Sequence, residues 1–255
     1  MIKHVAFVLS LTSISVFANS TIDSMNSVPD VKNESKKGFH GQVGLGAINK
    51  SEYLGSDDSE TIAVPLINVS YNDTFYFKLN RLGAWFYKNN QGFRVGGVIT
   101  TQGGYDKEDL PKNYQLFDRD STTLIGVNAQ YKRGMFSAEA GFLLGTGDNA
   151  KDDEGSEGGK LYVQAGYTFV ATSQYTLTGT VKIENWNEDL VEYYCGNKDS
   201  AMNVTAGVIG TYNINKKWTL IGAATVTSMG DEITDSPIVV NDSSNMLLIG
   251  ATYSF

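Results

Sequence analysis

Few residues of this chain combine the types and the spacing that catalysis would need. A nucleophilic serine or cysteine requires a histidine to take its proton, and past the first few positions the chain has only His40. His40 stands at the start of the first expected strand, and the single cysteine is Cys195. We therefore expect Cys195 to be a tolerated free thiol in a loop and the protein not to be an enzyme. Carboxylate-only chemistry stays open, because no Asp or Glu pair stands out from the rest.

The acidic run Asp148–Glu157 comes nearest to a metal-binding pattern. A calcium loop alternates its oxygen ligands in a fixed order and closes on a bidentate glutamate. This run lacks both features, so we expect a solvated surface loop, with no metal and no cofactor.

Four charged residues fall on the polar faces of alternating segments: Arg94, Glu139, Lys182 and Glu184. If these segments are strands of a closed barrel, the four side chains face its lumen, together with Asn128 and Gln130. They could line the constriction of a pore, or they could pair with one another and plug the barrel. The sequence leaves both alternatives open.

The segments that carry these residues alternate apolar and polar side chains with a period of two, as strands do. Residues 175–184 place Tyr, Leu, Gly, Val and Ile on one face and three Thr, Lys and Glu on the other. Such runs of about ten residues, separated by turn-like clusters, continue from residue 38 to the end of the chain. We predict an all-β fold, an antiparallel transmembrane β-barrel whose apolar face contacts lipid.

Counting the runs gives eleven, and the longest of them, residues 74–89, contains a turn-like Asn80–Gly83. Because a bacterial barrel has an even number of strands, splitting this run predicts twelve strands, with ten as the alternative. The connections then alternate between short periplasmic turns and long extracellular loops. The five long loops are expected at residues 51–59, 104–120, 147–159, 188–200 and 230–244.

The two ends of the chain favour the outer membrane of a Gram-negative bacterium. Residues 1–18 have the basic start, apolar run and small residues of a secretory signal peptide. Residues 19–37 are polar and aperiodic, which predicts a disordered periplasmic stub before a barrel at 38–255. The last strand ends with Tyr253 and Phe255, the aromatic signal that the barrel-assembly machinery reads. We expect that machinery, outer-membrane lipid and lipopolysaccharide as partners, and no nucleic acid, because the net charge is −8.

Aromatic residues gather near the expected strand ends, where interfacial girdles place their rings at headgroup level. We expect this role for residues that include Tyr76, Trp85, Trp186, Tyr193, Trp218 and Tyr253.

Two loop segments resemble the MipA/OmpV family of outer-membrane proteins over essentially the whole stretch from residue 38 to 255. The first loop carries Tyr53, Gly55, Ser56 and Asp57, and Val64-Pro65-Leu66 follows in the next strand. The last loop carries Gly230, Asp231, Asp235, Ser236 and Pro237, followed by Ile238-Val239. One departure is that Tyr193-Tyr194-Cys195-Gly196 stands where the family usually has Tyr-Phe-Gly-Val and a longer loop. From the turn chemistry of these residue types we expect the motifs to fold the loops rather than to bind a ligand.

The resemblance implies a barrel that acts as a scaffold, bringing a murein lytic transglycosylase together with a penicillin-binding synthase during cell-wall growth. It assigns no catalytic residues. Two alternatives stay open: a narrow solute channel through the charged lumen, and a surface adhesin or antigen acting through the extracellular loops.

Overall fold

The computed structural model describes residues 37–111, 114, 118–149 and 154–255. The predicted signal peptide at 1–18 and nearly all of the predicted stub at 19–37 lie outside the described residues.

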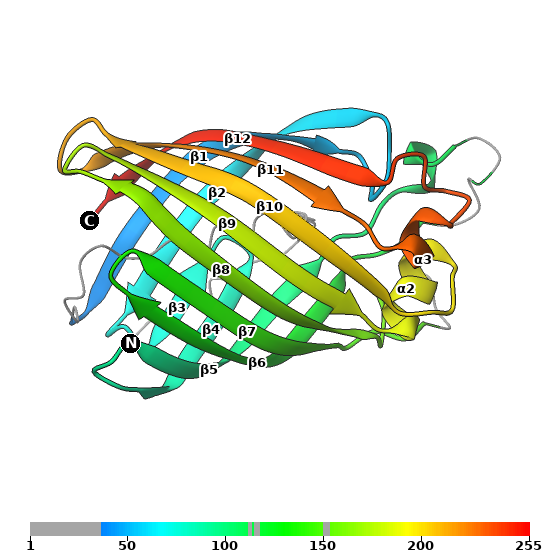
Figure 1. Cartoon of the computed structure of the whole chain (residues 1–255), viewed down its shortest axis with the longest axis horizontal. Coiled ribbons are helices and arrows are strands. Elements are labelled where there is room, and N and C mark those ends of the chain that lie inside the picture. Colours follow the sequence, from blue (N-terminus) through cyan, green and yellow to red (C-terminus); the bar gives the residue numbers. More distant parts are fainter. Residues whose placement is uncertain (1–36, 112–113, 115–117, 150–153) are drawn as a thin grey trace, which may run out of the picture.

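The described chain forms a closed antiparallel barrel of twelve strands, which confirms the predicted fold class and the larger strand number (Figure 1). Each strand pairs with its neighbours in sequence, and the last pairs with the first. The strands are β1 (Phe39–Ser51), β2 (Ser59–Tyr71), β3 (Phe75–Lys78), β4 (Arg81–Lys88), β5 (Phe93–Gln102), β6 (Thr122–Arg133), β7 (Phe136–Gly145), β8 (Gly159–Ala171), β9 (Tyr175–Trp186), β10 (Ala201–Asn213), β11 (Trp218–Ser228) and β12 (Ser243–Ser254).

The barrel closes between β1 and β12 in a register that runs from Gln42 opposite Ser254 to Lys50 opposite Met246. On β12 the outward Leu247 and Ile249 are 59% and 71% exposed, whereas Met246 and Leu248 are buried inside. Pairing both edges leaves no open strand at this seam, as a bilayer requires. The period-two pattern of the last strand therefore separates lipid from lumen.

The β3–β4 hairpin is much shorter than the rest of the wall. It turns at Leu79–Asn80, and β3 pairs with β2 only from Asn68 to Tyr71. The carbonyl of Ile67 still accepts a hydrogen bond from Leu79 N at 2.7 Å. Alternate residues of a strand point their backbone N–H and C=O groups to the same side. The backbone groups of Pro65 and Ala63 therefore point, like those of Ile67, to the side of β2 that faces β3, in the part of β2 that extends past the end of the short hairpin. Pro65 lacks an N–H, and proline in a sheet is confined to such edges.

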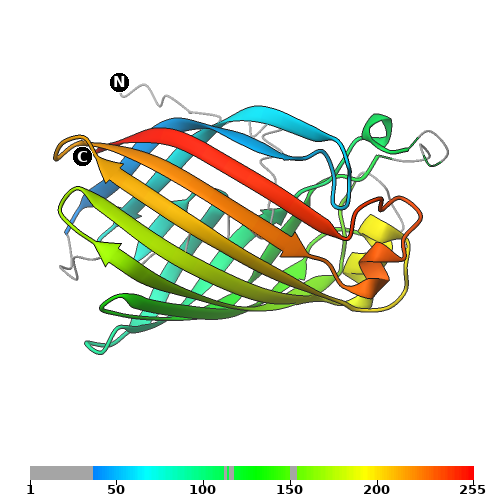
Figure 2. The ribbon, with the colours of Figure 1, turned by 45° about the horizontal axis from the view of Figure 1, so that its top comes forward.

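Two of the long loops contain short helices at one end of the barrel, α2 (Glu188–Cys195) and α3 (Asp231–Thr234) (Figure 2). A 3₁₀ turn, η1 (Lys107–Asp109), lies in a third loop. The Asn187 side chain caps α2 by accepting a hydrogen bond from Leu190 N, and Gly196 ends it in the left-handed conformation. Cys195 is thus the last residue of a helix, and the expectation that it lies in a loop was wrong. No helix among the described residues is long and apolar enough to cross a membrane.

The expected aromatic girdle is only partly present. Trp218, Tyr212 and Phe136 are exposed near the short-turn end of the barrel, as a headgroup-level ring requires. Four of the rings expected there are instead buried inside the barrel or under its loops: Tyr76, Trp85, Trp186 and Tyr193. The sequence places these rings near strand ends, but strand alternation and loop folding turn them inward.

Candidate functional site

The four charged residues expected in the lumen all lie on inward-facing positions of their strands. Glu139, Lys182 and Glu184 are 3%, 1% and 3% exposed. Arg94 is half-buried and lies near the short-turn end of β5. One row of the sheet carries Arg94, then Gln130, Glu139, Gln164 and Lys182 on successive strands.

Glu139 is the centre of the first polar cluster inside the barrel. Its Oε1 accepts a hydrogen bond from Arg81 Nη1 at 2.8 Å and one from the Tyr162 hydroxyl at 2.7 Å. Its Oε2 accepts one from Gln130 Nε2 at 2.7 Å, and Arg81 also donates to the Tyr162 hydroxyl. A carboxylate buried this deeply is tolerated only when a charge and several donors satisfy it. The cluster joins β4 to β8 across the inside of the barrel.

The second cluster is built around Glu184, closer to the long-loop end. Lys182 Nζ lies 2.5 Å from Glu184 Oε2, and Lys160 Nζ lies 3.6 Å from the same oxygen. Trp186 Nε1 donates to Glu184 Oε1 at 3.1 Å, and Lys160 donates to Gln102 Oε1 at 3.0 Å. Three of the predicted lumen charges, Glu139, Lys182 and Glu184, therefore have partners of opposite sign, as the plug alternative requires.

The candidate lumen residues taken from the sequence did not include Arg81, Lys160 or Tyr162, although these three complete the clusters. Arg81 fell within the expected Asn80–Gly83 turn, but it is the first residue of β4 and faces inward. Lys160 and Tyr162 continue the polar face of the run that starts at residue 160. Strict alternation along β8 could have found them, since Gln164 lies on the same face.

The first motif loop packs directly against the last one. The Tyr53 hydroxyl donates to the carbonyl of Ile238 at 2.9 Å. The carbonyl of Gly55 accepts from Val240 N and Asn241 N, both at 2.9 Å. Gly55 has φ 86°, and a Cβ there would stand 2.5 Å from Val239 Cγ1. This position therefore demands glycine both for its backbone and for the space it leaves.

The other motif residues divide between this contact and the surface. Ser56 is buried and its hydroxyl accepts from Asp58 N at 3.1 Å, while Ser236 donates to the carbonyl of Cys195 at 2.5 Å. Gly230 precedes the first residue of α3, Asp231. The exposed side chains are those of Asp57, Asp231, Asp235 and Pro237. The structure gives the buried members a role in joining loops.

Together these loops form a cap with its own hydrophobic core over the lumen. The core consists of Trp186, Leu190, Val191, Tyr193, Tyr194, Cys195, Ala201, Met229 and Ile233, with Leu54, Tyr105 and Val239 packed against it. The Tyr105 hydroxyl donates to the carbonyl of Tyr194 at 2.8 Å, and burial raises the pKa of both phenols. Burial also raises the pKa of the Cys195 thiol to about 12, which makes it a poor nucleophile at neutral pH.

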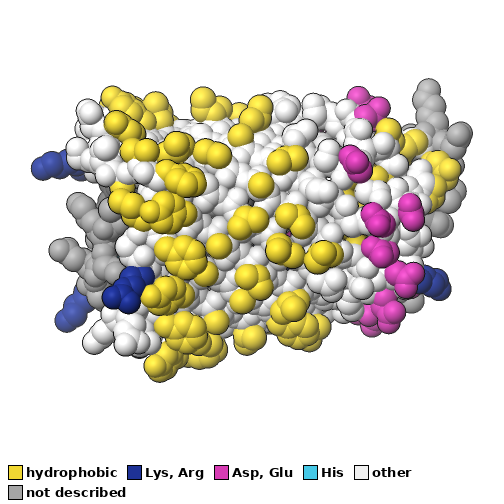
Figure 3. Space-filling model, in the orientation of Figure 1, with side chains coloured by type: hydrophobic (Ala, Val, Ile, Leu, Met, Phe, Trp, Pro, Cys, Tyr) yellow, Lys and Arg dark blue, Asp and Glu magenta, His cyan; other side chains and the backbone are white. Residues whose placement is uncertain are grey.

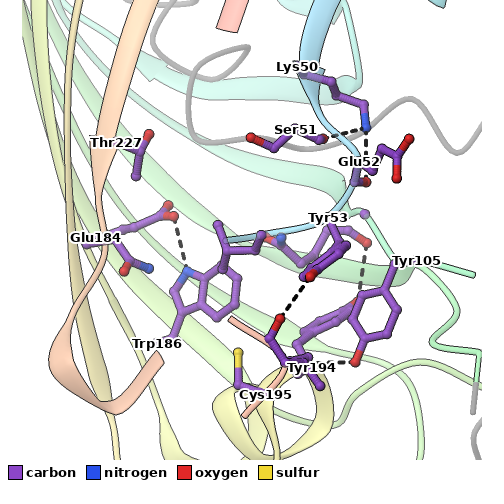
Figure 4. Close-up of a pocket in the computed structure, with 16 residues that line it drawn as sticks. Lys50, Ser51, Glu52, Tyr53, Tyr105, Glu184, Trp186, Tyr194, Cys195 and Thr227 are labelled. Atoms are coloured by element: carbon purple, nitrogen blue, oxygen red, sulfur yellow. Dashed lines mark hydrogen bonds between the residues drawn. The ribbon is translucent and has the colours of Figure 1, made fainter. Parts of the chain in front are cut away.

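A small cavity of about 50 Å³ separates the cap from the lumen (Figure 4). Tyr53, Tyr194 and Cys195 line it from the cap, and Glu184 and Thr227 line it from the barrel wall. This volume holds a few water molecules, whereas small-molecule sites usually measure about 300–1,000 Å³. This cavity between the cap and the lumen is therefore too small to hold a typical small-molecule solute.

Other candidates for chemistry stay apart from this site. His40 Nε2 lies 2.9 Å from Asp73 Oδ1 at the opposite end of the barrel. No group of three or more potential metal ligands occurs among the described residues, which include only part of the acidic run Asp148–Glu157.

The comparison with known families decides the assignment. The family model described as "MltA-interacting protein MipA" matches residues 43–255. The chain belongs to the MipA family. It is 27% identical to the MltA-interacting protein of Escherichia coli (strain K12) over 236 residues, which cover 84% of this chain and 91% of that protein. It is 24% identical to the outer membrane protein Omp26La of Vibrio anguillarum over 227 residues, covering 83% and 84% of the two chains.

This MipA-family protein is therefore an outer-membrane β-barrel, as the sequence predicted. Among solved structures it is similar to the NanC porin, with a TM-score of 0.47 and 13% identity over 83% of this chain and 100% of that one.

Proposed function

We propose that the protein is a non-enzymatic scaffold that holds a murein lytic transglycosylase near a penicillin-binding synthase at the periplasmic face of the outer membrane. The observation that carries the proposal is the cap: the long loops pack into a hydrophobic core directly above the lumen. Because Glu139 and Glu184 form ion pairs with Arg81 and Lys182 beneath it, the arrangement favours a fixed body over a conduit. The end with the short turns is then the surface that meets soluble partners.

The relatives add a reason to look at that end. The protein of Escherichia coli is named for interaction with MltA, and this chain covers 91% of its length. We carry the interaction to this chain as part of the proposal, with the synthase as the second partner that the family resemblance implies.

A crosslinking pull-down from native envelopes tests the proposal, with this barrel as bait and mass spectrometry as the readout. An unrelated outer-membrane barrel at the same expression level is the control bait. Recovery of a lytic transglycosylase and a penicillin-binding protein with this bait alone is the expected result. Recovery of only assembly machinery and lipopolysaccharide would contradict the scaffold.

A narrow solute channel is the second candidate, and one observation favours it. Gln164 is 1% exposed, faces inward, and its amide has no hydrogen-bond partner among the described residues. Buried amides normally bind protein groups or ordered water, so polar contents would suit this part of the lumen. Refolded protein in planar bilayers gives discrete conductance steps if the lumen conducts. Their absence would rule this candidate out.

A further inference from the structure

The two ends of the barrel carry opposite charge. Lys and Arg side chains gather at the end with the short turns, and Asp and Glu side chains gather at the end with the cap (Figure 3). In the described short turns, Asp73 is the only Asp or Glu side chain, and His40 already contacts it at 2.9 Å. The basic residues at this end are Lys37, Lys88, Arg94, Lys132, Arg133, Lys216 and Lys217. We name these seven residues the basic face.

The basic face has an outer and an inner part. Arg133, Lys216 and Lys217 are exposed in or beside the turns that follow β6 and β10. Lys217 Nζ donates to the Tyr253 hydroxyl at 3.0 Å, and this bond raises the pKa of Lys217, so the ammonium stays charged. Lys132 and Arg94 instead lie on inward-facing positions at the mouth of the lumen. The positive charge therefore surrounds the periplasmic opening and continues into it.

We propose that the basic face docks an acidic surface of a soluble periplasmic protein; this inference rests on the proposed scaffold function and names the surface that it would use. A set of like charges around an opening attracts a partner of opposite sign and speeds its association. Each exposed ion pair contributes little by itself, so the interaction depends on several charges acting together and weakens with salt.

The positions of the charges favour a protein over a lipid headgroup as the occupant. Lys216 lies in the turn beyond Trp218, the first residue of β11, whose exposed ring lies at headgroup level, whereas Arg133 stands opposite Phe136 at the level of that ring. The inward positions of Lys132 and Arg94 point away from lipid altogether. An acidic protein surface in the periplasm can reach the exposed charges of the outer part and the half-buried Arg94 at the mouth of the lumen.

The test uses the full barrel in nanodiscs of zwitterionic lipid, with a fluorescent decaglutamate peptide as the acidic probe. The variant Arg133→Glu/Lys216→Glu reverses two exposed charges and leaves Lys217, which contacts the last strand, unchanged. The matched control is Lys107→Glu/Lys198→Glu, the same charge change on exposed residues of the capped end. We expect decaglutamate to bind the wild type and the control alike and the variant about tenfold more weakly. Raising the salt concentration weakens binding to the wild type without any substitution.

A second arm replaces decaglutamate with the purified lytic transglycosylase. If the transglycosylase binds the wild type and the variant equally, the inference is overturned while the scaffold function stands. If it binds neither, although decaglutamate follows the expected pattern, the scaffold function fails while the acidic preference of the face stands. If anionic phospholipid added to the nanodiscs binds the wild type more strongly than the variant while neither probe distinguishes the two, the face is a lipid contact and the inference is overturned.

Discussion

Replacing Gly55 by alanine is expected to loosen the cap without unfolding the barrel. Gly55 has φ 86°, and its missing Cβ would lie 2.5 Å from Val239 Cγ1. A methyl group forced into a packed region costs about 1–3 kcal/mol, and left-handed backbone costs a non-glycine residue about 1–2 kcal/mol more. The packing cost alone would raise the equilibrium constant for opening of the cap roughly 5- to 150-fold.

The buried thiol of Cys195 reports this opening. It is the only cysteine, it is 6% exposed in the core of the cap, and burial raises its pKa to about 12. Maleimide labelling at neutral pH therefore requires the cap to open, and its rate follows the opening equilibrium. We expect Gly55→Ala to label at least about fivefold faster than the wild type.

Gly134→Ala is the matched control for this experiment. Gly134 also has a positive φ, 59°, but a Cβ there would meet nothing within 4 Å, and it lies in a short turn away from the cap. This variant should label at the wild-type rate. The double variant Gly55→Ala/Val239→Ala should label more slowly than the product of the two single-variant rate increases predicts. The shorter side chain at position 239 removes the clash with the new methyl group at position 55. Equal labelling of Gly55→Ala and Gly134→Ala would refute the reasoning that the two motif loops lock the cap.

Three further predictions follow from the interior, the thiol and the strand edge. Glu139→Ala removes the carboxylate that pairs with the buried Arg81 guanidinium, so the free energy of unfolding in urea should fall by about 3–5 kcal/mol. The double variant Arg81→Met/Glu139→Met removes both charges and should recover most of this loss. Equal losses in the single and double variants would contradict a paired interior. Burial raises the pKa of Cys195 from an ordinary 9.0 to about 12, so between these pH values the folded cap keeps a proton that the unfolded chain loses, and the free energy of unfolding should decline as pH rises from about 9 to 12. In Cys195→Ala this part of the decline should vanish, which a comparison of urea unfolding against pH for the two proteins measures. Identical pH profiles would count against the burial of the thiol. The amide of Ala63 points to the unpaired edge of β2, whereas Ala47 on β1 has a paired strand on each side. Amide hydrogen exchange followed by NMR should therefore be faster at Ala63 than at Ala47. Equal protection of the two amides would mean that another strand covers the edge.

The strands were predictable because each has two faces in different surroundings. Lipid selects apolar residues on one face and the packed, polar interior selects others, so Leu247 and Ile249 alternate visibly with their neighbours. The short β3–β4 hairpin was harder to place, because Arg81 is polar and stands beside a turn. Pro65 was a usable signal, since proline inside a thirteen-residue strand indicates an edge.

The cap was not predictable in its contacts, although parts of it left a trace. Asn187, acidic residues after it and Gly196 at the far end are the start and stop signals of a helix, and they could have revealed α2. The hydrogen bond from Tyr53 to Ile238 joins residues 185 positions apart. No local pattern predicts such a bond, because it depends on β1 and β12 meeting at the seam of the barrel.

The most direct test of the scaffold measures association between the two enzymes themselves. The apparent Kd between purified lytic transglycosylase and penicillin-binding synthase is determined with and without this barrel in nanodiscs, with empty nanodiscs as the control. The account predicts that the barrel lowers this Kd by about tenfold or more, as expected when one body holds both partners. A Kd that is the same with the barrel and with empty nanodiscs would contradict it.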